Sequence, residues 1–122
     1  GSALGALYTP ELSKLNSNAN LVIRFKASVY TEATKAYCDR ILVRAVTNAT
    51  FDAKGNITNA GSVTELQSTN VTIADAIGFF KEYTVTFSNI PPNARIVFSS
   101  EPADVSANKT RFLLDDVVVA IQ

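Results

Sequence analysis

Two pairs of adjacent identical residues carry most of the chemistry that this sequence offers. Asp115 and Asp116 interrupt the apolar run of the closing segment RFLLDDVVVAIQ, residues 111–122. Burying an ionised carboxylate is costly unless a partner, backbone donors or a metal compensates its charge. We therefore expect this pair at an exposed rim or bound to a compensating group. Strand alternation predicts one carboxylate on each face, so both can reach a single ion only if a bulge intervenes.

The second pair, Phe79 and Phe80, lies in a segment expected to be a loop, residues 74–80. Consecutive aromatic residues in a loop cannot both point into the same core, so one ring is expected to be exposed. An exposed ring offers a flat surface for the C–H face of a sugar. Tyr30 and Tyr37 flank a polar connection, residues 31–39, and are further candidates for a glycan-binding rim. The alternative is that one phenylalanine packs down, the other covers the loop, and the tyrosines only hydrogen-bond their neighbours.

The residue types that are missing exclude several kinds of site. The chain has no histidine, which rules out a Ser-His-Asp or Cys-His site within it and removes the commonest zinc ligand. Cys38 is the only cysteine, so no internal disulfide can form, and we expect it to be a small buried residue. The acidic residues number 11, but no pair stands in a recognisable catalytic motif. We therefore assign no catalytic residue and predict that the domain is not an enzyme.

Charge and hydropathy limit the partners. Lysine plus arginine and aspartate plus glutamate both number 11, so the formal net charge is zero and nucleic acid is not an expected partner. No stretch approaches the ~20 consecutive apolar residues of a membrane span. Gly1 and Ser2 look like an expression scar, which leaves residues 3–122 as one predicted domain.

The dominant period of the hydrophobic pattern is two, which indicates β-strands. The pattern predicts one short helix over residues 9–15, a hairpin tip at 52–56 and a strand stop at 89–93. It predicts strands over residues 21–30, 40–47, 62–67, 70–73, 83–88, 95–100 and 111–121. The fold class is therefore all-β, an antiparallel β-sandwich of the jelly-roll or immunoglobulin kind. The last strand is apolar on both faces, which predicts a central position in a sheet that is covered on both sides.

Three motifs carry a resemblance to a known family. They are LYTPELSKLNSNANLVIRFKASVY (7–30), YTVTFSNIPPNARIVFSS (83–100) and RFLLDDVVVA (111–120). Together they resemble the galactose-binding-domain-like jelly rolls of secreted and surface proteins of Bacteroidetes, which are related to carbohydrate-binding modules. The resemblance implies a non-catalytic, glycan-binding accessory module of a larger extracytoplasmic protein. Members of this family usually begin with a further upstream strand and often stack sugars on tryptophan, which this chain lacks.

The resemblance also implies a role for the aspartate pair. In such modules the aspartate of the closing strand often helps to hold a structural calcium, which points to Asp115 or Asp116. The alternative is that one aspartate caps backbone N–H groups or pairs with an arginine such as Arg111 or Arg95, while the other faces water.

A second function remains open at this point: a structural or protein-interaction β-sandwich, such as a spacer or adhesin domain, with no sugar ligand. The absence of tryptophan favours this second function, whereas the closing motif and the loop aromatics favour glycan binding.

Overall fold

The architecture comes from a computed structural model of the chain. It describes residues 2–4, 6–8, 17–29, 40–53, 57–73, 76, 78–100 and 111–122, with backbone alone at 2–4, 6–8, 100 and 111. The helix expected over 9–15, together with Tyr30, Tyr37 and Cys38, lies outside the described residues. The strands are β1 (Ser2–Leu4), β2 (Ala6–Tyr8), β3 (Ala19–Val29), β4 (Arg40–Thr47), β5 (Thr64–Thr72), β6 (Lys81–Ile90), β7 (Arg95–Ser100) and β8 (Arg111–Ile121).

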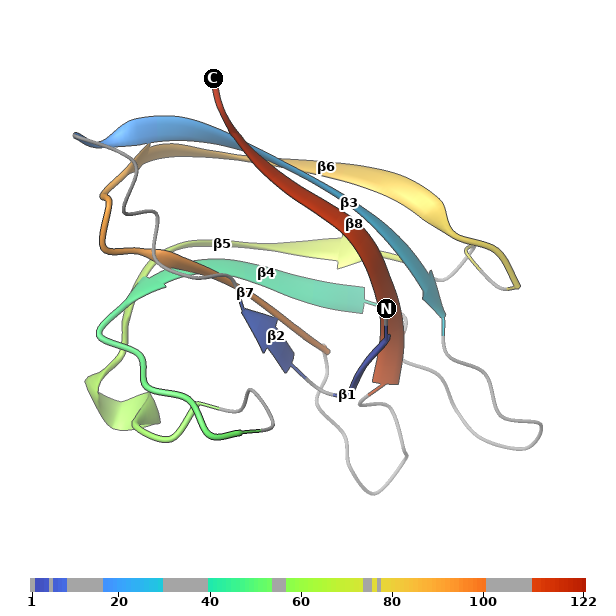
Figure 1. Ribbon diagram of the computed structural model, residues 1–122, viewed down its shortest axis with the longest axis horizontal. Helices are drawn as coiled ribbons and strands as arrows, with labels where there is room; N and C mark the ends of the chain where they lie inside the picture. The colour runs from blue at the N-terminus through green and yellow to red at the C-terminus, as the bar shows by residue number, and fades with distance from the viewer. Residues whose placement is uncertain are drawn as a thin grey trace.

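These strands form two four-stranded sheets that pack face to face (Figure 1). The strand order is β1-β8-β3-β6 in one sheet and β2-β7-β4-β5 in the other, and every pairing within them is antiparallel. The chain is thus folded in half at the β4–β5 connection, and strands of increasing separation pair on either side of it. This is the eight-stranded double-sheet arrangement of a jelly roll, so the predicted fold class is confirmed.

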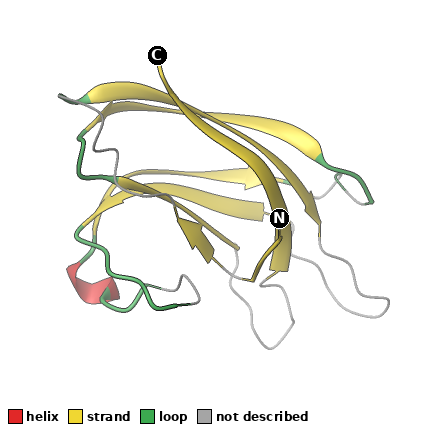
Figure 2. Cartoon of the chain, in the orientation of Figure 1, coloured by secondary structure: helices red, strands yellow, loops and turns green. Residues whose placement is uncertain are grey.

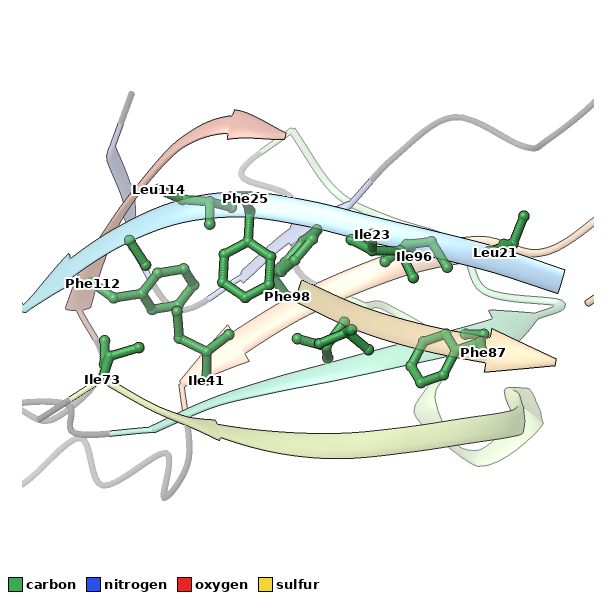
Figure 3. Close-up of a cluster of buried hydrophobic side chains, with 14 of the residues drawn as sticks. Leu21, Ile23, Phe25, Ile41, Ile73, Phe87, Ile96, Phe98, Phe112 and Leu114 are labelled. Carbon is green, nitrogen blue, oxygen red and sulfur yellow. The ribbon is translucent and has the colours of Figure 1, made fainter. Parts of the chain in front are cut away.

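Alternation of apolar and polar residues explains why these segments become strands. In β3 the side chains of Leu21, Ile23 and Phe25 are buried, whereas Arg24 and Lys26 between them are exposed. The inward rows of both sheets meet in one core, and Figure 3 shows its largest side chains in the space between the layers. At its centre the rings of Phe25, from one sheet, and Phe98, from the other, meet edge to face with centroids 5.2 Å apart.

Several strand predictions are confirmed and one is wrong. The bounds predicted for β4, β7 and β8 match the observed ones. The two weak strands predicted over 62–67 and 70–73 are a single strand, β5. The polar residues Ser68 and Thr69 do not interrupt it, because their backbone pairs continuously with Arg44 and Val43 of β4.

The position of β8 also differs in part from the prediction. The strand lies inside its sheet, between β1 and β3, as expected for a central strand. However, its outer face is not covered in the described structure, since the side chain of Val118 is 51% exposed. The apolar residues on both faces therefore reflect β-propensity as well as burial.

Asparagine and aspartate mark the irregular points of the strands. Asn48, Asn89 and Asp116 have positive φ angles of 63°, 57° and 51°. Asn89 and Asp116 lie where the pairing of β3 with β6 and with β8 shifts by one residue. These residue types enter the left-handed region more readily than most others, so they are suited to bulges.

Helical structure in the described residues is limited to one 3-10 turn, Ala60–Ser62, in the β4–β5 connection (Figure 2). None of the described helical structure is long and apolar enough to cross a membrane. In this connection Phe51 and Ile57 form an antiparallel bridge, which agrees with the hairpin prediction, although residues 54–56 of the predicted tip lie outside the described residues.

Candidate functional site

The loop between β5 and β6 is anchored to the body of the sandwich before it reaches its aromatic pair. Ile73 and Ala76 are fully buried. The carbonyl oxygen of Ala76 accepts hydrogen bonds from the backbone N–H of Val29 and from the hydroxyl of Ser28, both at 2.9 Å. The N–H of Ala76 in turn donates to the carbonyl of Ile73 at 2.9 Å. This half of the loop is therefore held against the end of β3.

Beyond this anchor the chain turns outward and presents both phenylalanines. Gly78 has a φ angle of 82°, a conformation that residues with a side chain rarely adopt. Phe79 and Phe80 follow it and are 55% and 43% exposed. The prediction that at least one ring of the pair is exposed is confirmed, and the structure exposes both.

The aspartate pair lies in a bulge of β8, within the same sheet as β3 and β6. Arg24 pairs with Val118 and Lys26 pairs with Asp115, so one residue more lies on β8 than on β3 between these pairs. Asp116, with its positive φ, is the extra residue, and both aspartates are exposed. The prediction of one carboxylate on each face is therefore wrong, because the bulge interrupts the strand alternation on which it depended.

Neighbouring groups compensate the two carboxylates. The Nζ of Lys26 lies 3.2 Å from Oδ2 of Asp116. The backbone N–H of Asp116 donates to Oδ1 of Asp115 at 2.9 Å, and this bond, with a smaller effect from the charge of Lys26, lowers the pKa of Asp115. Lys26 was not singled out from the sequence, because which residue of β3 lies opposite Asp115 depends on the shifted register.

The calcium role of Asp115 and Asp116 stays a prediction. Within the described residues no group of three or more acidic, cysteine or histidine side chains is placed to hold a metal ion. A cation bound at Asp116 would also have to displace the Lys26 ammonium. The role requires calcium to raise the melting temperature, since an ion that binds only the folded state stabilises it.

A groove runs along the seam where the two sheets expose their edge strands, β5 and β6. Its volume is about 460 Å³, and it is lined by Thr69, Asn70, Val71, Thr72, Thr84, Val85 and Thr86. A hydrogen-bonded bridge crosses the same seam: Nε2 of Gln67 donates to the carbonyl of Ser88 at 2.6 Å, and the N–H of Ser88 donates to Oε1 of Gln67 at 3.1 Å. Sequence reasoning missed the groove, because the stacking of β5 under β6 is a property of the whole topology.

A second cavity of about 110 Å³ lies at the other end of β4. It is lined by Val46, Thr47, Asn48, Ala49, Asn93 and Arg95. The guanidinium of Arg95 also lies over the ring of Phe51, 5.6 Å from its centroid. The volume is well below the ~300 Å³ at which ligand pockets usually begin, so this cavity is not a candidate for a sugar.

Comparisons with known proteins add little to this geometry. No protein-family model and no curated protein sequence matches the chain. Among solved structures the chain is similar to one described as "Family 16 Carbohydrate Binding Module-2", with a TM-score of 0.48 and 11% sequence identity. The match covers 98% of this chain and 72% of that one. Similarity at this level carries no argument about ligand or activity.

Proposed function

We propose that this domain is a non-catalytic carbohydrate-binding module in which Phe79 and Phe80 form the sugar-stacking surface. The observation that carries the proposal is the exposure of two consecutive aromatic rings, 55% and 43%, on a loop that the fold anchors. Aromatic rings are large apolar surfaces whose exposure to water is unfavourable unless a ligand covers them.

The anchoring of the loop supports this role. Hydrogen bonds from Val29 and Ser28 fix Ala76 two residues before Gly78. A ring that is held in place before the ligand arrives loses less conformational entropy on binding. The loop is thus suited to present a preformed surface.

The absence of a catalytic role is part of the proposal, on the ground that the chain has no histidine and no recognisable catalytic carboxylate pair. An extracytoplasmic location and a place within a larger bacterial protein are also part of it, and both rest on the sequence resemblance alone.

The test is binding of the purified chain to a panel of immobilised polysaccharides, followed by titration with the best binder. Phe79→Ala and Phe80→Ala should each weaken binding by about tenfold, which corresponds to about 1.4 kcal/mol. Val118→Ala is the matched control, because it also removes an exposed apolar side chain but from β8. Absence of binding across the panel, or equal losses in the control and the phenylalanine variants, would reject the proposal.

The alternative is a structural or protein-interaction sandwich with no sugar ligand. The observation that favours it is the position of β5 and β6 at the edges of their sheets, since edge strands can pair with another chain. β5 has nine residues, with Glu65 as its one charge and no lysine or proline to discourage such pairing. Self-association without glycan binding would support this alternative.

A further inference from the structure

The groove between β5 and β6 has the size of a ligand site and an unusual lining. Its volume of about 460 Å³ lies within the ~300–1,000 Å³ typical of small-molecule sites. Four of its seven lining residues are threonines, one is Asn70, and the remaining two are Val71 and Val85. None of the lining side chains is charged.

This lining is complementary to a neutral, hydroxyl-rich ligand. Each threonine hydroxyl can donate one hydrogen bond and accept others, and the Asn70 amide offers both donors and acceptors. Sugar hydroxyls need this mixture. A carboxylate or sulfate would instead lose hydration in the groove without meeting a positive side chain there, which is unfavourable.

The groove also leads toward the aromatic surface, from which residues 81–83 of β6 separate it. The bridge between Gln67 and Ser88 bounds it at one end, and the lining residues follow from there toward the end of β5 and the start of β6. The loop that carries Phe79 and Phe80 connects these two strand ends. Thr84 and Phe80 are four residues apart, which is about 13 Å in an extended chain, so a ligand that touches both must be longer than one sugar ring.

We propose that the β5–β6 groove binds a neutral, linear oligosaccharide chain that continues from the Phe79–Phe80 surface toward the Gln67–Ser88 bridge. This inference rests on the proposed function and adds the ligand class, its minimum length and its path. It places the polysaccharide along the seam of the sandwich, with threonine hydroxyls and the Asn70 amide contacting the sugar hydroxyls.

The test begins with affinity electrophoresis in neutral polysaccharides (β-glucan, mannan, xylan and galactan) and in acidic ones (polygalacturonate, alginate and chondroitin sulfate). Neutral polysaccharides should retard the chain and acidic ones should not. Oligosaccharides of increasing length from the best binder are then titrated by calorimetry. Affinity should rise at least tenfold between the monosaccharide and the tetrasaccharide.

A paired substitution tests the path of the chain. The double variant Thr84→Val, Thr86→Val removes two hydroxyls while keeping β-branched side chains of the same shape, so the strand should be preserved. It should weaken tetrasaccharide binding by about tenfold and leave monosaccharide binding unchanged. Thr64→Val is the control, because Thr64 is an exposed threonine of β5 outside the groove.

The outcomes separate this inference from the proposed function. The groove inference is rejected, and the aromatic site kept, if binding depends on Phe79 and Phe80 but not on Thr84 and Thr86. Equal affinity for the monosaccharide and the tetrasaccharide has the same meaning. Equal retardation by acidic polysaccharides overturns the ligand class. Absence of any glycan binding rejects both. Concentration-dependent self-association in sedimentation velocity, altered by the double variant and without glycan binding, assigns the groove to a protein strand instead.

Discussion

β3 and β8 are neighbours within one sheet, whereas β5 and β6 are edge strands that face each other across the seam between the two sheets. β3 and β8 form a ladder along most of their length, and the single irregularity in it is occupied by Asp116 and compensated by Lys26. β5 and β6 belong to different sheets, and the described structure joins them through the side chain of Gln67. The β5–β6 contact leaves a groove of about 460 Å³.

This difference separates two features that look alike in the sequence. Both pairs are unexpected where they stand: the aspartates are charged residues within an apolar strand, and the phenylalanines are apolar residues in a loop. The aspartates are accounted for by partners within the protein, whereas both phenylalanines keep large exposed areas. The fold thus supplies partners for the aspartates, whereas under the proposed function a glycan covers the phenylalanines.

The largest expected effect concerns the bulge of β8. Asp116→Val places a β-branched residue at a φ angle of 51°, which costs about 2 kcal/mol of unfolding free energy because its two γ-methyl groups crowd the backbone in a region that Asp enters more readily. Asp116→Asn removes the charge but tolerates the same φ, so it should change the unfolding free energy by less than about 0.5 kcal/mol. Urea unfolding measures both. Equal destabilisation by the two variants would mean that the Lys26 ion pair, and not the backbone conformation, matters here.

The next effect concerns the bridge across the seam. Gln67→Met keeps the length of the side chain but loses both hydrogen bonds to Ser88, which should lower the unfolding free energy by about 1 kcal/mol. Ser68→Ala, a neighbouring exposed change in β5, should have little effect. If Gln67→Met is no more destabilising than this control, water replaces both hydrogen bonds without loss of unfolding free energy. The Gln67–Ser88 bridge then contributes nothing to holding β5 and β6 together.

The smallest effect concerns the pH dependence of Asp115. Its pKa is lowered in the folded protein, chiefly by the backbone N–H of Asp116, so the folded state favours the ionised carboxylate. The resulting stabilisation is complete above the unfolded pKa of about 3.9 and is lost as the pH falls through the lower folded pKa. Asp115→Asn should therefore be less stable than the parent at neutral pH, and the difference should narrow below the unfolded pKa. Urea unfolding midpoints of the variant and the parent, from neutral pH to below the unfolded pKa, measure this stability difference. A difference that is constant at every pH would contradict the prediction.

Much of the fold could be predicted because it depends on local patterns. Alternation of apolar and polar residues predicts the strands over 21–29, 40–47 and 95–100, and the prolines after Ile90 predict the end of β6. Each of these signals lies in residues that are adjacent in the chain. The bulges were not predictable in the same way. Whether Asp116 takes the left-handed conformation depends on its pairing with β3, which lies about 90 residues earlier in the chain.

The candidate site was predictable in part for the same reason. Two adjacent aromatic residues in a loop already limit how many rings can be buried, so the exposure of Phe79 and Phe80 follows from local geometry. The groove brings together residues 69–72 and 84–86 from the edges of two different sheets. No short stretch of sequence reports that contact, because threonines are common in strands whatever they face.

The bulge at Asp116 has a consequence for how β8 can change in length. The inward side chains are Phe112 and Leu114 before it, and Val117 and Val119 after it. If Asp116 were deleted, these four side chains would still alternate inward along a regular strand, with Asp115 outward between them. Asp116 is thus a site in the middle of a strand where the chain can gain or lose one residue without exchanging its buried and exposed faces, a tolerance normally found only in loops.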